Sequence, residues 1–404
     1  MNIHAYSEED FGCLVAFTNG KVGLYDETVL DFLKHDASHE ECQPYKLKKL
    51  VISDNFHLKS PLITWLELTR RCNLECKHCF AGGGQPAENE LSTAELVNLL
   101  DNLRAKNTFS LVFSGGEPLL HNDFLSIFNY ARKLKFVITL VTNGVLLTED
   151  IIKQLPTDNF RLTISIDGFS EHSRLRGNVE TKPLLDKLLL LKKYNIPCNV
   201  SSTMTADNIF ELEELFTWLI KHEITFRTIP FSPLGRGASH SYLQLGSEHV
   251  VVAAKLWEME IKHEKLMRSK VGLTFSTFYD FALNLVYMAR RCKGGRSVAY
   301  ITSTGDVYPC TTCVGANMFA VGNIRELSFE EIWERSFDEF RKITWEDYEV
   351  CKECLLSSPE YFCTNRCPPL AKIHKDDMFS CGSTLYDRAS LKLRTDLLQV
   401  MDKD

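Results

Sequence analysis

The sequence has no long apolar run, no basic cluster and no low-complexity tract. No apolar segment approaches the roughly 20 residues that a helix needs to cross a bilayer, so we expect no membrane contact. The segment from Met1 to Asp10 lacks the basic and apolar regions of a secretory signal peptide. A formal net charge of -7 without a basic patch gives no reason to expect a nucleic-acid partner. Together these absences predict a cytoplasmic protein.

Cysteine, in contrast, is abundant. Fourteen cysteines occur in 404 residues, and eleven of them lie in two zones, 72–79 and 292–381. Because thiols stay reduced in the cytoplasm, disulfides explain this number poorly. Both zones therefore predict metal binding. The remaining three, Cys13, Cys42 and Cys198, match no motif, and we expect them to be small buried residues.

The first 60 residues predict a small unit of their own. An apolar run over 14–17 is followed by Asn19-Gly20 and a second apolar run over 22–24. Asn-Gly between two apolar runs predicts a tight hairpin, because both residues tolerate positive φ. A short helix is expected over about 29–33. A unit of this size is marginally stable alone, so we expect it to dock on the rest of the chain.

Residues 61–245 alternate apolar strands with amphipathic helices. The expected strands are 62–69, 109–113, 136–142, 161–166, 197–203 and 224–229. Ser92 and Glu95 have the spacing of a capping box, which predicts a helix start after the first strand, and helices are expected near 181–194 and 208–222. Strands joined by helical crossovers predict a parallel sheet. An open doubly wound sheet and a partial barrel both fit this pattern.

The last third of the chain predicts one linking helix, over 246–269, and a cysteine-rich unit over 270–404. A second capping box, Ser328 with Glu331, predicts one clear helix in that unit. Its buried side would carry Ile332, Trp333, Phe337 and Phe340. We find no fixed-period repeat along the chain.

The first cysteine zone, Cys72, Cys76 and Cys79, directly follows the first expected strand of the α/β unit. Three thiolates in one loop can bind three irons of a 4Fe–4S cube and leave the fourth iron without a protein ligand. That vacancy can take the amino and carboxylate groups of a small molecule. The alternative is a structural zinc site, which needs a fourth ligand such as His78.

This spacing resembles the signature of the radical S-adenosylmethionine (SAM) superfamily, and the resemblance extends over about 61–240. Ser114-Gly115-Gly116-Glu117-Pro118 matches the family's Gly-Gly-Glu motif, and later motifs also follow expected strand ends. The resemblance implies an α/β fold with a partial (β/α)6 TIM-like barrel. It also implies contacts of Arg176 with the SAM carboxylate and of His78 with adenine. The complete set of SAM-binding residues that it implies is His78, Ser114, Gly115, Gly116, Glu117, Asn143, Ser165, Asp167, Arg176 and Leu234.

The second zone resembles the SPASM extension of radical SAM enzymes, which houses two auxiliary 4Fe–4S clusters. The eight residues between Cys354 and Cys363 exceed the usual gap, and a zinc ribbon is the alternative. The resemblance implies three 4Fe–4S clusters in all. The expected ligands of the first auxiliary cluster are Cys292, Cys310 and Cys367, with Cys313 as the candidate fourth ligand. Those of the second are Cys351, Cys354, Cys363 and Cys381.

In this family, an electron from the first cluster cleaves SAM to methionine and a 5′-deoxyadenosyl radical, which abstracts a hydrogen atom from the substrate. The resemblance implies an oxidoreductase that modifies a ribosomally made precursor peptide with a leader, with a carbon–carbon or thioether cross-link as the expected product. Its partners would be an electron donor such as flavodoxin or ferredoxin and, in some systems, a separate leader-binding protein. Residues 1–60 loosely resemble part of the peptide-recognition domain of peptide maturases, and a structural cap on the barrel is the alternative. No catalytic residue is assigned.

Three alternatives remain open. A haem or tetrapyrrole side-chain maturase is supported by the similar segment from Phe231 to Gly237. Sulfatase-maturing enzymes have a similar cluster layout but carry an aspartate where this chain has Thr311, and Thr is no carboxylate base. A non-catalytic iron–sulfur electron-transfer protein is disfavoured, because it would not need Glu117 and Arg176 in a SAM site.

Overall fold

The computed structural model describes residues 3–10, 12–18, 21–33, 38–47, 56–267, 291–354, 356 and 366–379. Its main sheet has nine strands in the order β12-β11-β10-β4-β5-β6-β7-β8-β9. Six of them are parallel neighbours that follow one another in sequence: β4 (Ile63–Glu67), β5 (Ser110–Ser114), β6 (Val137–Thr142), β7 (Phe160–Ser165), β8 (Cys198–Met204) and β9 (Thr225–Pro230). All six expected strands are therefore confirmed, and the fold is the expected partial barrel.

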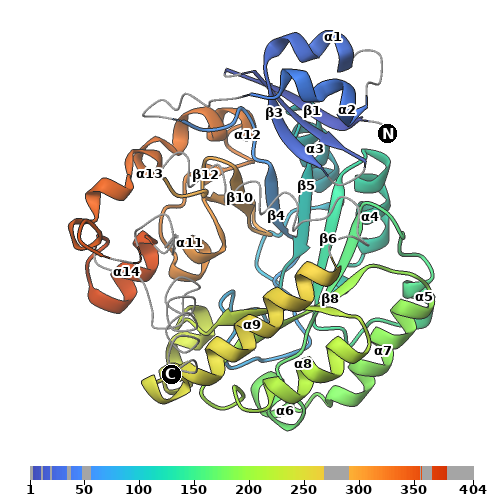
Figure 1. Ribbon diagram of the computed structural model, residues 1–404, viewed down its shortest axis with the longest axis vertical. Helices are drawn as coiled ribbons and strands as arrows, with labels where there is room; N and C mark the ends of the chain where they lie inside the picture. The colour runs from blue at the N-terminus through green and yellow to red at the C-terminus, as the bar shows by residue number, and fades with distance from the viewer. Residues whose placement is uncertain are drawn as a thin grey trace, which may run out of the picture.

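Helices cover the outer face of these strands (Figure 1). They are α3 (Thr93–Ala105), α4 (Phe124–Lys133), α5 (Glu149–Ile152), α6 (Ser170–Arg176), α7 (Thr181–Lys193), α8 (Leu212–Lys221) and α9 (Val250–Met267). The expected capping box at the start of α3 is present, because Ser92 and Glu95 cap each other's backbone. The expected linking helix is α9, and it packs on the barrel: Glu260 accepts hydrogen bonds from the Thr228 N–H and hydroxyl, at 2.8 and 2.6 Å.

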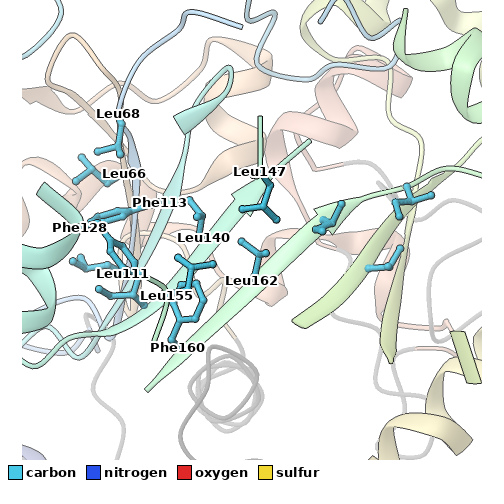
Figure 2. Close-up of a cluster of buried hydrophobic side chains, with 14 of the residues drawn as sticks. Leu66, Leu68, Leu111, Phe113, Phe128, Leu140, Leu147, Leu155, Phe160 and Leu162 are labelled. Atoms are coloured by element: carbon cyan, nitrogen blue, oxygen red, sulfur yellow. The ribbon is translucent and has the colours of Figure 1, made fainter. Parts of the chain in front are cut away.

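The core lies between the strands and these helices. Figure 2 shows Leu111 and Phe113 of β5, Leu140 of β6 and Leu162 of β7 projecting into one apolar layer. Parallel strands that are covered on both faces have nearly continuous apolar sequences. The six barrel strands could therefore be predicted from the sequence.

The sheet continues into the cysteine-rich unit, which the sequence did not predict. Strand β10 (Val298–Ile301) pairs in parallel with β4, and β11 (Asp306–Tyr308) and β12 (Gly322–Asn323) follow in antiparallel pairing. The barrel and the C-terminal unit therefore share one sheet. A run of four residues carries too short a pattern to distinguish a strand from a buried loop.

Short helices surround this extension of the sheet. They are α11 (Thr311–Ala316), α12 (Phe329–Glu331), α13 (Asp338–Lys342) and α14 (Pro368–Lys375), with a π-helical segment over Ile332–Ser336. Ser328 caps α12 as expected, and the four predicted side chains are buried. The expected single helix is interrupted, however, by the π-helical segment between α12 and α13.

The N-terminal unit is a three-stranded antiparallel sheet, in the order β1 (Ile3–Glu9), β2 (Gly12–Phe17) and β3 (Val22–Tyr25). β2 and β3 pair as the expected hairpin, although Asn19 and Gly20 themselves lie outside the described residues. The expected helix is present as a 3-10 turn, Glu27–Val29, and α1 (Leu30–Leu33), with α2 (His39–Cys42) after it.

This small sheet docks on the barrel, as expected. Leu14, Ala16 and Leu24 of its inner face pack against Phe109 and Val137, where β5 and β6 begin. Figure 1 shows the unit (blue) beside the starts of these strands. It therefore covers the end of the barrel opposite the carboxyl ends of the strands. Among the described helices, none combines the length and apolarity needed to cross a membrane.

Candidate active site at the carboxyl ends of the strands

The first cysteine loop follows β4 and is held by backbone hydrogen bonds from distant segments. The Cys72 N–H donates to Gly84 O at 2.8 Å, and the Arg236 N–H donates to Cys79 O at 2.9 Å. The guanidinium of Arg236 also donates to Cys76 O at 3.1 Å. Cys76 is buried, and the other two cysteines are half-buried. The three thiols are therefore displayed by a loop whose backbone is fixed on both sides.

The Gly-Gly-Glu motif lies against this loop. The Gly116 N–H donates to Thr69 O at 2.8 Å. A Cβ atom on Gly116 would lie 2.4 Å from Arg70 O and 2.5 Å from Arg71 O, and one on Gly115 would lie 2.4 Å from Thr69 O. Gly115 also has a φ of 150°, which side chains rarely adopt. Only glycine permits this contact between two backbones, which forms an open cradle beside the cysteines.

Glu117 joins the motif to the end of β6. Its carboxylate is buried and accepts hydrogen bonds from the Thr142 hydroxyl and the Asn143 N–H, both at 2.8 Å. Burial raises the pKa of Glu117 to about 7. Asn143 in turn donates from its side chain to Asn73 Oδ1 in the cysteine loop, at 2.8 Å. The structure thus places these residues in one network, and the expected contact of Glu117 with SAM stays a prediction.

Asp167, Arg176 and His78 form a buried charged cluster. Asp167 Oδ2 lies 2.5 Å from Arg176 Nε and 3.2 Å from His78 Nε2. Asp167 Oδ1 accepts from the Thr203 N–H at 2.8 Å. Burial disfavours the charge of Asp167, but the neighbouring Arg176 and His78 outweigh it and hold its pKa at about 2. Three residues that were expected to bind SAM therefore contact one another.

This cluster reaches the thiols and leaves one polar atom for a ligand. Arg176 Nη1 lies 3.9 Å from Cys76 Sγ. His78 Nδ1 is buried and has no hydrogen-bond partner among the described residues. The three thiols are surrounded by the glycine backbone of Gly115 and Gly116, the buried guanidinium of Arg176 and the unpartnered Nδ1 of His78. These groups fit an iron–sulfur cluster that binds the amino and carboxylate groups of SAM. Burial, together with the charge of Arg176, lowers the pKa of His78 to about 4, although Asp167 raises it.

The other expected SAM residues also lie at strand ends. Ser114 and Ser165 are the last residues of β5 and β7. Leu234 is buried in the loop after β9. Gly235 has a φ of 52°, and a Cβ atom there would lie 2.1 Å from Phe80 O, so this loop rests on the cysteine loop. Ligand sites in barrels are built at these carboxyl ends.

The four cysteines expected at the first auxiliary cluster come together. Cys310 and Cys313 lie at the start of α11, with their sulfurs 3.7 Å apart, and Cys292 shares their apolar cluster. Cys367, which precedes α14, interacts electrostatically with Cys310 and Cys292. The hydrogen bond with Cys313 and the backbone N–H groups of α11 lower the pKa of Cys310 to about 6 despite burial. Cys313 therefore lies beside Cys310, and its role as the fourth ligand stays a prediction.

The second auxiliary set is only partly described. Cys351 and Cys354 are half-buried after a 3-10 turn, Glu349–Cys351. Cys363 and Cys381 lie outside the described residues. The assignment of this set stays a prediction.

One buried carboxylate was missed by the sequence interpretation. Glu67, the last residue of β4, accepts hydrogen bonds from the Tyr300 hydroxyl at 3.1 Å and the Ser303 hydroxyl at 2.8 Å. Tyr300 packs with Cys292 and Cys313, so this contact bridges the two cysteine zones. The available signal was an acidic residue in an otherwise apolar strand.

Glu67 also lines a cavity of about 440 Å³ between the barrel and the C-terminal unit. Arg70, Phe80 and Gly82 come from the first cysteine loop, and Tyr308 comes from β11. The cavity therefore adjoins both cysteine zones.

Comparisons with known proteins agree with this geometry. The model of the radical SAM superfamily matches residues 66–219, and that of SPASM, an iron–sulfur cluster-binding domain, matches residues 292–355. An AdoMet-dependent heme synthase of Methanosarcina barkeri is 30% identical over 306 residues, which are 70% of this chain and 84% of that protein. The chain belongs to the radical SAM superfamily. It is a radical SAM/SPASM enzyme that binds SAM and iron–sulfur clusters.

Two further relatives of this radical SAM/SPASM enzyme are informative. Mycofactocin maturase MftC of Mycobacterium tuberculosis is 28% identical over 296 residues, which are 70% of this chain and 74% of that protein. Streptococcus suis SuiB, solved with its precursor peptide SuiA, superimposes with a TM-score of 0.71 at 16% identity. That match covers 96% of this chain and 98% of SuiB, so the two share a fold.

Proposed function

We propose that this enzyme modifies a ribosomally made precursor peptide, with a carbon–carbon or thioether cross-link as the product. The observation that carries the proposal is the N-terminal sheet, which is docked on the barrel and presents a strand at its edge. Such an edge suits an extended peptide, which can add as a further strand. The fold shared with SuiB over 96% of the chain, and the relationship to MftC, support the same substrate class.

The proposed ligand sets follow the cysteine zones. Cys72, Cys76 and Cys79 would hold the first cluster, and SAM would occupy the glycine cradle beside Arg176 and His78. Two SPASM clusters would bring the total to three. When bound, SAM and the first cluster supply the hydrogen-abstracting radical. An external flavodoxin or ferredoxin would supply the electron.

The chain's own residues would position these groups. The close contact between Gly116 and the cysteine loop would form one side of the SAM site. Glu117 holds the loop after β6 in place by accepting a hydrogen bond from the Asn143 N–H. The cavity beside Glu67 would hold the reacting part of the substrate, since it adjoins both cysteine zones. Its carboxylates, Glu67 and Asp306, are candidates to hold a polar group of the peptide there.

A haem or tetrapyrrole maturase is the second candidate, because the relative from Methanosarcina barkeri is a heme synthase at 30% identity. The loop from Phe231 to Gly237, which supports that candidate in the sequence, lies against the cysteine loop at Phe80. The sulfatase-maturing alternative is weaker, because Thr311 is the first residue of α11 and adds no carboxylate beside Cys310.

A competition between substrate classes tests the proposal. The anaerobically reconstituted enzyme is incubated with SAM, reductant and either a candidate peptide, encoded by a neighbouring short reading frame, or an iron-coproporphyrin. The peptide is expected to lose two hydrogen atoms by mass spectrometry, and a variant without Cys72, Cys76 and Cys79 is expected to leave it unchanged. Loss of carbon dioxide from the porphyrin, with an unmodified peptide, would support the second candidate instead.

A further inference from the structure

Two arginines are buried in the C-terminal unit. Arg296 lies shortly before β10 and is 3% exposed, and Arg341 lies in α13 and is fully buried. Figure 1 shows β10 and α13 in the same part of the molecule. Arginine is almost never fully buried unless its charge is paired. Both residues therefore need a partner of opposite charge.

Backbone carbonyls satisfy only part of the two guanidiniums. Arg341 donates from Nε to Gly295 O at 2.6 Å and from Nη1 to Glu334 O at 3.4 Å. Arg296 donates from Nη2 to Arg341 O, so the two side chains lie together. Within the described part of the chain, Arg296 Nε, Arg296 Nη1 and Arg341 Nη2 have no hydrogen-bond partner.

Carboxylates do not balance these two charges. Among the described residues, the one ion pair of either guanidinium joins Arg341 Nη1 to Asp338 Oδ1, at 4.0 Å, and Asp338 is half-exposed. Water screens such a pair strongly, so it contributes little. Burying a cation without a partner is costly, and this cost indicates a further anion close to the two arginines.

A tight turn joins Arg296 to Cys292, an expected ligand of the first auxiliary cluster. The Arg296 N–H donates to Lys293 O at 3.2 Å, and a turn of this kind keeps its first and fourth Cα atoms within about 7 Å. Inside the turn, the Gly294 N–H donates to Cys292 Sγ at 3.4 Å. Burial lowers the pKa of Arg296 to about 10, although the neighbouring Cys292 raises it. The charge of Arg296 therefore acts on this thiol.

An iron–sulfur cluster at these cysteines would supply the missing anion. A 4Fe–4S cluster with thiolate ligands is negatively charged, and its reduction by one electron adds a further negative charge. A cation nearby attracts the reduced form more strongly than the oxidised form. It therefore raises the reduction potential of the cluster.

We propose that Arg296, supported by Arg341, is the counter-charge of the first auxiliary cluster and raises the reduction potential of that cluster. Arg341 holds the turn through Gly295 O and adds a second positive charge. The inference rests on the assignment of Cys292 and its neighbours to a SPASM cluster, and it does not depend on the substrate. A cluster with a raised potential is suited to accept an electron.

Reduction potentials of the full-length, anaerobically reconstituted enzyme test the inference. The clusters are titrated with a reductant and followed by electron paramagnetic resonance, and the signal that Cys310→Ala abolishes marks the first auxiliary cluster. Arg296→Met is expected to make reduction of that cluster at least tenfold less favourable, which lowers its potential by about 59 mV for one electron. Arg296→Lys keeps the charge and should change the equilibrium less than threefold. The matched control Arg132→Met removes an exposed charge on α4 and should leave the potential unchanged.

Asp338→Asn is a second test that leaves the buried residues in place. Asp338 offsets part of the charge of Arg341, so its neutralisation should make reduction about twofold more favourable. An unchanged potential in Arg296→Met at normal iron content, or an equal shift in Arg296→Lys, would overturn the inference. Should Arg296→Met lose the cluster, an unchanged or lowered potential in Asp338→Asn overturns it instead. These measurements use no substrate, so the proposed function stands or falls separately.

Discussion

The buried pair of Asp167 and Arg176 makes two separable predictions about one substitution. Asp167 has a fully buried side chain, and Arg176 is 10% exposed. Arg176→Ala removes the guanidinium and leaves the carboxylate beside His78, whose pKa of about 4 keeps the imidazole neutral near pH 7. Breaking a buried ion pair by removing one partner costs about 3–5 kcal/mol, because the other charge stays desolvated.

The expected fall in melting temperature follows from the size of the chain. At about 2.1 cal/mol/K per residue, 404 residues give an unfolding entropy of about 0.85 kcal/mol/K. A loss of 3–5 kcal/mol therefore lowers the midpoint by about 4–6 °C. Asp167→Asn removes the stranded charge, so the double variant should be more stable than Arg176→Ala alone. This comparison isolates the charge from the lost packing.

The second readout is SAM affinity. If Arg176 also binds the SAM carboxylate, its removal should weaken SAM binding about ten- to a hundredfold. This follows because a hydrogen bond to a charged group contributes about 1.5–3 kcal/mol. Circular dichroism melting and equilibrium SAM binding are measured anaerobically on samples of equal iron content. An unchanged midpoint in Arg176→Ala, or a double variant that is no more stable, would refute the buried-pair argument. Unchanged SAM affinity would show that Arg176 acts only within the protein.

Three further predictions concern other parts of the molecule. Gly116→Ala should weaken SAM binding more than tenfold, because its Cβ would clash with the backbone carbonyls of Arg70 and Arg71. Gly84→Ala in the same loop region should bind SAM normally, because its Cβ would make only an ordinary contact, 3.8 Å from Arg236 Nη2. Replacing the three cysteines of the first loop by Ala should remove about a third of about twelve irons and abolish SAM cleavage; persistent cleavage would contradict the assignment. Burial lowers the pKa of His4 to about 4 in the folded protein, so between about pH 6.5 and 4 the unfolded chain binds a proton that the folded protein does not. Over this range the melting temperature of the wild type should therefore fall faster than that of His4→Gln. Parallel melting curves would contradict this.

Deletion of the N-terminal unit is a poor test of its role in peptide recognition. Its inner face, with Leu14 and Ala16, packs on the barrel, so deleting residues 1–58 would expose Phe109 and Val137. A truncated enzyme would then lose stability for reasons unrelated to peptide recognition.

The sequence by itself determined the local features of this protein. All six barrel strands were predictable, because each is a short apolar segment between helical patterns, and the capping boxes at Ser92 and Ser328 involve residues three positions apart. The first cysteine loop was predictable for the same reason. Its ligands are close in sequence, and their spacing is itself the signal.

Only the tertiary structure decided the contacts between distant residues. Glu67 meets Tyr300 across 233 positions, and β10 joins β4 although its own four residues carry no distinctive pattern. Likewise, the pairing of Asp167 with Arg176 and His78, and the docking of the N-terminal sheet on the barrel, depend on which segments pack together. Spacing and periodicity report the interactions within an element, whereas burial and charge pairing between elements arise only when the chain has folded.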